Sequence, residues 1–329
     1  MLAIGGLNMS KMIEVKNLKK YFEVKRGFKK SKLKAVDGVS FYINKGETFG
    51  LVGESGCGKS TVGRLITTLF KATSGEILIE GIDISKMSSK ELKPYRKKIQ
   101  SIFQDPYASL NPYMTIEEIV SESLEEQGIL NKEERKEKII TTLEKVGLNK
   151  EVLTRYPHEF SGGQRQRIGI ARAIIVEPEF IFCDEPISAL DVSIQAQVIN
   201  MIYDIQKEMN LTLLFVAHDL AMVRHISDRI GVMYLGHLVE VSKSDDLYVD
   251  PLHPYTKILL SSIPIPNPRL RDRKRMLAEG ELLSQINPPK CCLFHTRCPY
   301  SNDICENTIP LMEEVKEGHF VACHRVGEI

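Results

Sequence analysis

The chain has 329 residues, of which 44 are basic and 43 acidic, so its formal net charge is +1 at pH 7. With 43% hydrophobic and 26% charged residues, it has the composition of a soluble globular protein. The near-neutral balance disfavours binding of nucleic acid through the field of the whole molecule. This length predicts two structural units with a core that needs no disulfide staples.

The sequence predicts neither a membrane-spanning segment nor a signal peptide. No apolar run approaches the roughly 20 residues needed to cross a bilayer. The start, MLAIGGLNMSK, lacks the basic leader of a signal peptide, and we expect residues 1–11 to form an N-terminal extension. We therefore expect a cytosolic protein, where structural disulfides are rare. The basic run KRGFKKSKLK, residues 25–34, is interpreted as a solvated loop.

The predicted elements alternate between strands and helices. β-Branched and aromatic residues predict strands at 12–24 and 39–53, the second ending in a Gly-rich turn, and a strand pair at 75–84. Apolar residues at helical spacing predict a helix at 60–70. Charged, helix-prone segments with glycine stops, between about 112 and 150, indicate a helical insertion.

The second half continues this alternation. A helix is expected to open at residue 161, and apolar strands at 180–184 and 211–217 each end in polar residues. Such strands alternating with helices predict an α/β fold with a parallel sheet covered on both faces. The proline-rich segment 251–270 is interpreted as a linker to a cysteine-rich tail.

The segment GESGCGKS, Gly53 to Ser60, fits the pattern G-x-x-x-x-G-K-[ST]. Its glycines let backbone N–H groups wrap phosphates, and the helix that follows points its positive N-terminus at them. Lys59 would reach the β and γ phosphates, and the Ser60 hydroxyl would bind magnesium. The residues predicted to contact the nucleotide here are Gly53, Glu54, Ser55, Gly56, Cys57, Gly58, Lys59, Ser60 and Thr61.

Two carboxylates follow the apolar strand FIFCD. Asp184 is its last residue and Glu185 comes next. Parallel sheets place their ligands at the carboxyl ends of strands. We therefore predict that Asp184 holds magnesium, directly or through water, and that Glu185 polarises the attacking water.

The segment SGGQRQR, Ser161 to Arg167, is a second candidate anion site. Ser161 is a good helix N-cap, and the two glycines after it leave N–H groups exposed at the start of a helix. An ordinary capped helix is the commoner fate of such a segment. Because the chain already has a phosphate loop, a second anion site predicts a second nucleotide contact.

Taken in order, these motifs resemble those of ATP-binding-cassette ATPases. The series is the phosphate loop, Gln104 in FQDP, the signature SGGQR, FIFCDEP, SALD with Asp191, and His218 in FVAHD. The resemblance covers residues 12 to about 260. It implies a P-loop NTPase core with an antiparallel β subdomain, a helical subdomain at about 105–172, and a separate C-terminal extension at 261–329.

The resemblance also implies a head-to-tail dimer with ATP between the phosphate loop of one subunit and the signature of the other. Asp191 would then link the two sites across the interface. The signature residues that would contact the partner's nucleotide, the first three of them at its γ-phosphate, are Ser161, Gly162, Gly163 and Gln164.

Further roles follow from the same resemblance. Gln104 would contact magnesium or the lytic water and relay the nucleotide state to the helical subdomain. His218 would grip the γ-phosphate and work with Glu185. Phe22 would stack on adenine, with the neighbouring Tyr21 as the second choice.

The segments VGESGCGKST, FQDPYASLNP and DPLHPYTKILLSSIP resemble those of ATPase subunits of dipeptide and oligopeptide importers. This implies a motor at the cytoplasmic face of the membrane: ATP binding closes the cassette dimer, and hydrolysis reopens it. Two separate permease subunits and an extracytoplasmic peptide-binding protein would be its partners, and the second cassette could be identical or a paralogue. The expected cargo is a di- or oligopeptide, and nickel or oligosaccharide stays open as the alternative.

Two other readings remain. A soluble cassette ATPase acting on DNA or ribosomes usually carries two cassettes or a basic surface, and this chain has neither feature in its sequence. The third reading is a metal-binding regulatory module with residual ATPase activity. No nucleic-acid partner is expected.

The tail holds five cysteines, of which we take four as metal ligands: Cys292, Cys298, Cys305 and Cys323. Thiolates clustered in a reducing compartment predict a metal site, and their chemistry suits either zinc or an iron–sulfur cluster. The resemblance to peptide-importer ATPases implies a 4Fe–4S cluster. Cys291 stands where that family has glycine, so it is left spare, although the choice between Cys291 and Cys292 stays open. If the metal is zinc, the alternative ligands are His295, His319 and His324. The other two cysteines, Cys57 and Cys183, are interpreted as small buried side chains.

Overall fold

A computed structural model describes residues 10–26, 29–125, 128, 131–263, 280–281 and 283–329. These residues fall into two compact units that alternate along the chain. The first unit comprises Met1–Glu14, Tyr42–Glu47 and Ile77–Leu214. The second comprises Val15–Phe41, Thr48–Glu76 and Phe215–Ile329. Residues 1–9 of the predicted N-terminal extension lie outside the described part.

The first unit contains a short hairpin arm, three neighbouring strands of a sheet and five of the ten described α-helices. Strand β8 also reaches into the second unit. Its strands and helices, in chain order, are β5 (Ile82–Asp83), α2 (Lys93–Lys98), β6 (Ile99–Ile102), α3 (Ile116–Glu125), α4 (Lys132–Lys145), α5 (Gly162–Ile174), β7 (Phe180–Asp184), α6 (Val192–Met209) and β8 (Thr212–Val216). Two short 3-10 helices, Lys150–Val152 and Pro157–Glu159, precede α5.

The strands of the first unit follow the order β8-β7-β6. β6 and β7 are parallel, with Ile99 opposite Phe180 and Ile102 opposite Cys183. All five residues of β7 are buried, and so are all five of β8. A continuous apolar run is the pattern of a parallel strand that is covered on both faces. The predicted strands at 180–184 and 211–217 are thus confirmed.

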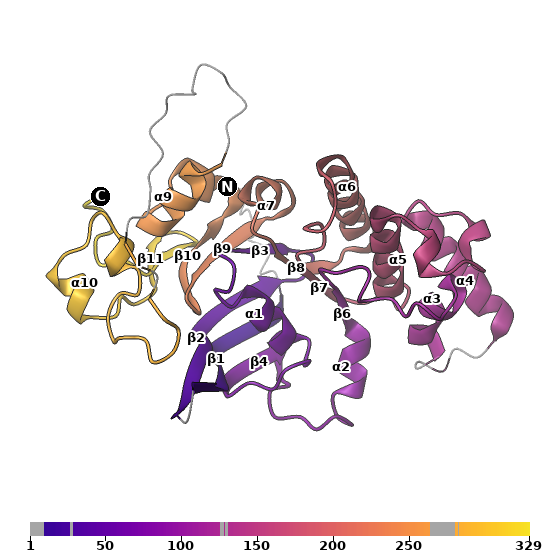
Figure 1. The fold of residues 1–329 in the computed structure, drawn as a ribbon, viewed down its shortest axis with the longest axis horizontal. Helices are drawn as coiled ribbons and strands as arrows, with labels where there is room; N and C mark the ends of the chain where they lie inside the picture. The colour runs from indigo at the N-terminus through magenta and orange to yellow at the C-terminus, as the bar shows by residue number, and fades with distance from the viewer. Residues whose placement is uncertain (1–9, 27–28, 126–127, 129–130, 264–279, 282) are drawn as a thin grey trace, which may run out of the picture. The chain divides into compact units, whose positions relative to one another are not determined.

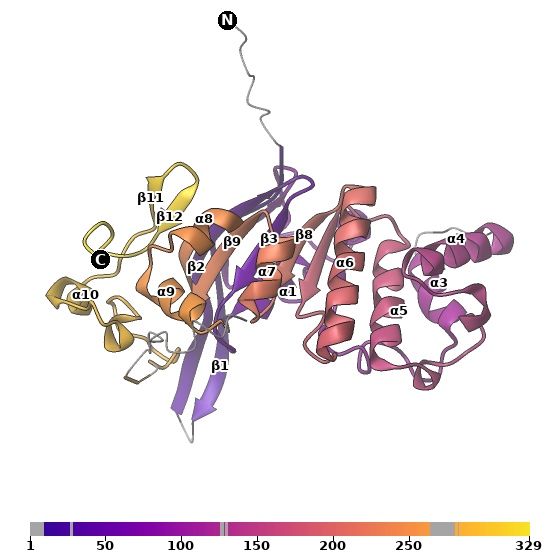
Figure 2. The same cartoon turned by 90° about the horizontal axis from the view of Figure 1, so that it is seen from above.

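Helices α3 and α4 lie in the segment 112–150 where the sequence predicts a helical insertion, and both pack against α5, the helix predicted to open at 161 (Figures 1 and 2). The sequence explains the bounds of α4. The side chain of Asn131 caps its start, Glu133 and Glu134 lie in its first turn, and Gly147, with φ +72°, follows its end. The acidic residues complement the positive end of the helix dipole, and glycine adopts a positive φ without strain.

The second unit holds the remaining elements. They are β3 (Thr48–Val52), α1 (Lys59–Ile66), α7 (Leu220–Ile226), β9 (Arg229–Tyr234), β10 (His237–Lys243), α8 (Ser244–Val249), α9 (Pro254–Ser261), α10 (Asp303–Asn307), β11 (Glu313–Lys316) and β12 (His319–Val321). A 3-10 turn spans His295–Arg297. The long strands β1 (Lys11–Arg26) and β2 (Lys29–Asn44) and strand β4 (Ser74–Ile79) each have residues in both units.

The sheet strands of the second unit follow the order β11-β12-β10-β9-β3. β3 and β9 are parallel, with Val52 opposite Val232, whereas β9–β10 and β10–β12 are antiparallel. Helix α7 packs on β3, and α8 packs on β9 and β10. The pairing of β12 with β10 makes the end of the chain part of this sheet, as the strands of the C-terminal segment in Figure 1 show.

Three local predictions need correction. The predicted strand at 39–53 is divided between β2 and β3 because the chain turns at Gly46, which has φ +73°. The basic run 25–34 is largely strand, since β1 extends to Arg26 and β2 begins at Lys29. The predicted linker at 251–270 contains helix α9, which His253 caps and Pro254 opens; residues 264–270 lie outside the described part.

Among the described residues, no helix is both long and apolar enough to cross a lipid bilayer.

Candidate functional site

The phosphate-loop motif lies in the second unit, between buried strand β3 and helix α1. Gly53 has φ +148° and Gly58, the residue before α1, has φ +108°. A Cβ atom on Gly53 would lie 2.2 Å from the Met233 carbonyl oxygen, and one on Gly58 would lie 2.2 Å from that of Ala35. Only glycine fits at either position, and the resulting loop leads its backbone N–H groups into the start of a helix.

Lys59 places a positive charge inside this loop. Its side chain is buried, and its ammonium donates hydrogen bonds to the carbonyl oxygens of Gly53 at 2.8 Å and Glu54 at 3.1 Å. Ser60 and Thr61 follow in the first turn of α1 and are half-buried. The Cys57 side chain is buried, as predicted, and burial raises the pKa of its thiol. The loop therefore combines a fixed cation, helix-start N–H groups and hydroxyls, which is the donor set a polyphosphate requires.

Two carboxylates end β7 in the first unit. Asp184 is 1% exposed, and Glu185 follows it with φ +47°, an uncommon conformation for a non-glycine residue. The Gln104 side-chain amide donates a hydrogen bond of 2.9 Å to Glu185 Oε2. The structure therefore brings together Gln104 and Glu185, which the sequence analysis had placed in one reaction from separate motifs.

Ser161 caps α5 as expected. Its hydroxyl accepts the backbone N–H of Gln164 at 3.3 Å, and the Gln164 side chain accepts the N–H of Ser161 at 3.1 Å. This reciprocal pair is a capping box and fixes the start of the helix. Gly163 lies so close to Ile194 that a Cβ would be 2.5 Å from its Cγ2 atom. Ser161 and Gln164 are exposed, so the signature residues begin a helix at the surface of the unit.

Asp191 and His218 lie at two further helix starts. Asp191 caps α6 in the first unit and accepts the Ser193 hydroxyl at 2.7 Å and the Ile194 N–H at 3.1 Å. His218 is exposed in the second unit, directly after β8 and before Asp219, the cap of α7. The capping bonds explain Asp191 locally, so its predicted link across a dimer interface stays a prediction.

Phe22 and Tyr21 point to opposite faces of β1, as neighbours in a strand do. The Phe22 ring meets Phe70 edge to face at 5.7 Å between centroids. The Tyr21 hydroxyl donates to Asp37 at 2.6 Å, and burial together with that carboxylate raises its pKa to about 12. Phe70 lies shortly after α1, the helix that begins at the phosphate loop. The face of β1 that carries Phe22 is therefore the one that packs toward this helix.

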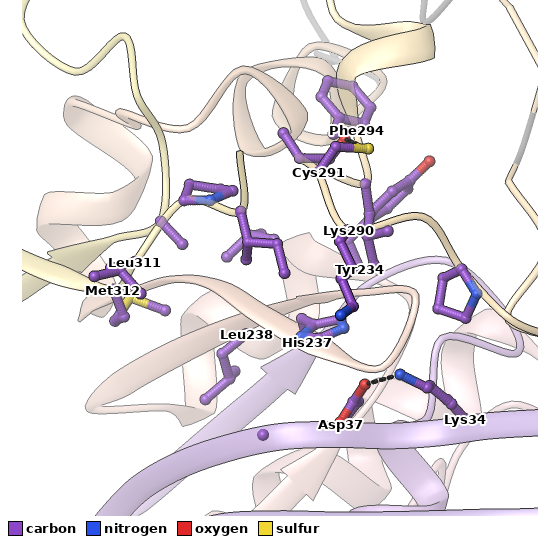
Figure 3. Close-up of a pocket in the computed structure, with 18 of the residues that line it drawn as sticks. Lys34, Asp37, Tyr234, His237, Leu238, Lys290, Cys291, Phe294, Leu311 and Met312 are labelled. Atoms are coloured by element: carbon purple, nitrogen blue, oxygen red, sulfur yellow. Dashed lines mark hydrogen bonds and ion pairs between the residues drawn. The ribbon is translucent and has the colours of Figure 1, made fainter. Parts of the chain in front are cut away.

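The Tyr21 face lines a cavity of about 640 Å³ within the second unit. Figure 3 shows Lys34 paired with Asp37 on one wall, and Tyr234, Phe294 and Cys291 on another. Leu311 and Met312 from the C-terminal segment close a further side. The cavity is therefore lined jointly by residues of β1 and β2 and by residues of the cysteine-rich extension.

The four predicted ligand cysteines influence one another electrostatically. Burial, with smaller contributions from Cys305, Cys323 and Cys298, raises the pKa of Cys292 to about 12. Burial likewise raises the pKa of Cys298 and of Cys323, with the other thiols adding to it. For Cys291, the cause after burial is Glu306, and none of these thiols contributes.

These thiols do not form a metal site in the structure. Within the described ranges, no set of three or more His, Cys, Asp or Glu side chains is arranged to hold a metal ion. The His alternatives have other partners: His319 Nε2 is 2.7 Å from Glu240, His295 Nδ1 is 2.6 Å from the Cys292 carbonyl oxygen, and His324 Nε2 is 3.1 Å from that of Thr308. The structure therefore does not support the predicted metal-binding extension, and the cluster stays a prediction.

The sequence analysis missed the side chains that hold Glu54 of the phosphate loop. Arg297 makes two 3.1 Å contacts with the Glu54 carboxylate, and the Tyr255 hydroxyl accepts the Glu54 backbone N–H at 2.9 Å. Arg297 and Glu54 are 243 residues apart, and no local pattern predicts such a contact. The one available signal was the position of Arg297 next to Cys298.

Comparison with known families gives two matches. The family described as "ABC transporter" matches residues 36–188, and the family described as "Oligopeptide/dipeptide transporter, C-terminal region" matches residues 239–305. The first match includes the phosphate loop, Gln104, the signature and both carboxylates. The second includes α9 and three of the four predicted ligand cysteines.

Curated relatives are similar over nearly the whole chain. The putative oligopeptide transport ATP-binding protein YkfD of Bacillus subtilis is 56% identical over 315 residues, covering 95% of each chain. AppF of the same organism, an oligopeptide transport ATP-binding protein, is 54% identical and covers 96% of this chain and 98% of its own. OppF of Salmonella typhimurium, also an oligopeptide transport ATP-binding protein, is 52% identical over 96% of each chain.

Among solved structures, a dimeric post-hydrolysis state of the ATP-binding cassette MJ0796, bound to ADP and Pi, matches with a TM-score of 0.64. It is 31% identical and covers 71% of this chain and 99% of its own. This similarity is to an α/β cassette fold.

Proposed function

We propose, from the premise that this chain belongs to the ABC transporter family and to its group of oligopeptide transport ATP-binding proteins, that it is the ATP-hydrolysing motor of a peptide importer. The observation that carries this proposal is the high identity to peptide-transport relatives over nearly the full length, tail included. The substrate would be ATP and the cargo di- or oligopeptides.

We propose that the phosphate loop and the β7 carboxylates act on one ATP. Lys59 and the loop N–H groups would hold the phosphates, while Ser60, Gln104 and Asp184 would hold magnesium, whose preferred ligands are oxygens. When bound, magnesium would neutralise charge on the phosphates. Glu185 would accept the proton of the attacking water, and its hydrogen bond with Gln104 supports this role by orienting the carboxylate. His218 would contact the γ-phosphate, and Phe22, with Tyr21 second, would stack on adenine.

We further propose that two cassettes form a head-to-tail dimer. The N–H groups at the start of α5, with Ser161, Gly162, Gly163 and Gln164, would contact the ATP held by the partner, and Asp191 would lie at the interface. The capping box supports this role because it fixes the residues that would meet the phosphate. The partner cassette would be a second copy or a paralogue.

The proposed setting is the cytoplasmic face of the cell membrane. Two permease subunits would carry the transport path, and an extracytoplasmic peptide-binding protein would deliver the cargo. The proposed organisation is an N-terminal extension at 1–11, a cassette at 12–260 with a helical subdomain at about 105–172, and a C-terminal extension at 261–329.

We also propose that Cys292, Cys298, Cys305 and Cys323 hold a 4Fe–4S cluster, with zinc as the alternative. Four thiol donors suit such a cluster. Cys292, Cys298 and Cys323 each accept a backbone N–H from the residue two positions further along the chain, a contact that stabilises thiolate. Cys291 shares none of the electrostatic interactions that join the other thiols, which supports leaving it out. The cluster would stabilise the extension rather than take part in hydrolysis.

The variant Glu185→Gln tests the motor. It should lower ATP hydrolysis by at least about 100-fold, because it removes the base, while ATP binding persists and the dimer accumulates. ATPase rate, ATP affinity and mass by light scattering measure these three effects. Glu177→Gln is the matched control, since Glu177 also has a positive φ but is an exposed acid paired with Lys138. A Glu185→Gln variant that stays monomeric with ATP and the native partner cassette present would contradict the dimer mechanism.

A further inference from the structure

We propose that Arg297, in the C-terminal extension, is a positioning residue for the phosphate loop, acting through its ion pair with Glu54. The inference rests on the proposed function, because it assigns to the extension a part in ATP binding. It concerns residues of the second unit only.

The ion pair is a two-point fork. Arg297 Nη1 lies 3.1 Å from Glu54 Oε2, and Nη2 lies 3.1 Å from Oε1. The two side chains are 15% and 35% exposed, so the pair is partly shielded from water. Two parallel N–H···O bonds from a planar guanidinium fix the orientation of the carboxylate as well as its position, which a point charge does not do.

Arg297 is itself held on an aromatic support. Its Nη1 lies 3.4 Å from the Tyr234 hydroxyl oxygen, and its guanidinium carbon is 6.0 Å from the centre of that ring. Phe294, at the start of the same turn, packs edge to face on Tyr234 at 5.2 Å (Figure 3). The guanidinium is therefore placed by the fold of the extension and is not a free surface side chain.

A second contact fixes the backbone of the same loop residue. The Tyr255 hydroxyl accepts the Glu54 N–H at 2.9 Å, and Tyr255 is fully buried in α9. Its ring packs on Tyr234 at 4.7 Å and on Phe294 at 5.4 Å. Glu54 is thus bound at its carboxylate by Arg297 and at its N–H by Tyr255, and both of these side chains contact Tyr234.

Glu54 is a sensitive point of the phosphate loop. Its carbonyl oxygen accepts the Lys59 ammonium, and it follows Gly53, whose φ of +148° sets the turn. Its carboxylate is also a negative charge beside the place where a polyphosphate would bind. Arg297 compensates that charge and holds the loop in one conformation, so less ordering remains to be done when ATP binds.

The competing reading is that the ion pair only anchors the extension, with no effect on the loop. The two readings differ in one measurable respect. An anchor affects the stability of the extension, whereas a positioning residue changes the affinity for ATP and leaves the rate at saturating ATP little changed, because Arg297 touches no reacting atom.

The test is a double-mutant cycle in the full-length chain, with ATP affinity measured by calorimetry in the presence of magnesium. Arg297→Met should weaken ATP binding roughly three- to tenfold, because it leaves the Glu54 carboxylate uncompensated. Adding Glu54→Gln should restore part of that loss. Arg297→Lys, which keeps the charge without the fork, should be intermediate. The matched control is Lys316→Met, which breaks an ion pair of the same extension with Asp250, away from the loop.

Each outcome decides the proposal. Effects of Arg297→Met and Glu54→Gln on ATP affinity that simply multiply would overturn it, since the two residues would then not act as a pair. An equal loss of affinity in Lys316→Met would also overturn it, since any loosening of the extension would then weaken ATP binding. Unchanged ATP affinity in both Arg297 variants would overturn it as well, whether thermal unfolding is native or lowered, since the ion pair would then be at most an anchor. If the unaltered chain bound no ATP, the proposed function itself would fail; if it bound ATP and only Arg297→Met were silent, the inference alone would fail.

Discussion

The phosphate loop and the cysteine-rich extension lie in the same unit but are held in different ways. The loop takes its shape from nearby backbone: Gly53 and Gly58 adopt positive φ, and Lys59 donates to carbonyl oxygens five and six residues before it. The extension, described at 280–281 and 283–329, has short elements and depends on distant contacts, such as β12 with β10 and Arg297 with Glu54. The phosphate loop can therefore match its sequence motif at every position and still depend on a segment distant in sequence to hold its conformation.

The largest effect is expected from a substitution in the phosphate loop, the locally determined member of this comparison. Gly58→Ala should abolish measurable ATP binding and destabilise the fold by about 3 kcal/mol or more, because its φ is +108° and the new Cβ would lie 2.2 Å from the Ala35 carbonyl oxygen. Gly56→Ala is the matched control: φ is +79°, but no atom lies within 4 Å of the new Cβ. It should cost only the strain of about 1–2 kcal/mol. Calorimetry and thermal unfolding measure both; equal effects would contradict the steric argument.

A second prediction breaks the extension. Protein purified without oxygen should contain iron and acid-labile sulfide, near about four each per chain as a 4Fe–4S cluster requires. Cys292→Ser should remove both, whereas Cys291→Ser should leave them in place, because Cys291 lacks the interactions that join the other thiols. Metal and sulfide analysis with the visible spectrum measures this. One zinc and no sulfide in the native chain would make the tail a structural clip and contradict the cluster.

The same contrast explains what could be read from sequence. The capping box of Ser161 and Gln164, the glycines of the loop and the buried strand before Asp184 each depend on a few neighbouring residues, and the structure has all three. The sequence assigns Gln104 and Glu185 to one reaction only through the resemblance of whole motifs, and their direct hydrogen bond is a finding of the structure.

Long-range contacts escaped this reading. Arg297 meets Glu54 through tertiary packing, and nothing in the residues near either one encodes the other. The prolines of segment 251–270 predict a linker, yet Pro254 lies in the first turn of α9 with His253 as its cap, a position where proline costs no hydrogen bond. The prolines were therefore interpreted as breaking helices, although Pro254 stands where a helix begins. This helix carries Tyr255, one of the residues that connect the phosphate loop to the extension.

A third prediction concerns that joining helix. Burial lowers the pKa of His253 to about 4, and its Nδ1 accepts the Tyr255 N–H at 3.1 Å. The folded pKa lies below the unfolded value of about 6.5, so the unfolded chain binds more protons and stability falls as pH drops from about 6.5 toward 4. Between pH 7 and 5 this should cost about 2 kcal/mol. Urea unfolding should show a smaller loss in His253→Asn, which keeps a capping oxygen. An equal loss in both proteins would assign the acid sensitivity to other groups.

The smallest expected effect sharpens which contact joins extension to loop. The Gln285 side-chain amide also reaches the loop, but its 3.4 Å distance to the Gly56 carbonyl oxygen is long for a hydrogen bond. The backbone carbonyl oxygen of Gln285 accepts the Lys34 N–H, and this bond does not depend on the side chain. Gln285→Ala should therefore change ATP affinity by less than about twofold, well below the effect of Arg297→Met. Calorimetry on the two variants side by side makes the comparison. A loss of ATP affinity as large as that of Arg297→Met would show that the Gln285–Gly56 contact matters as much as the ion pair at Glu54. The extension would then affect the loop through several contacts and not through the charge of one side chain.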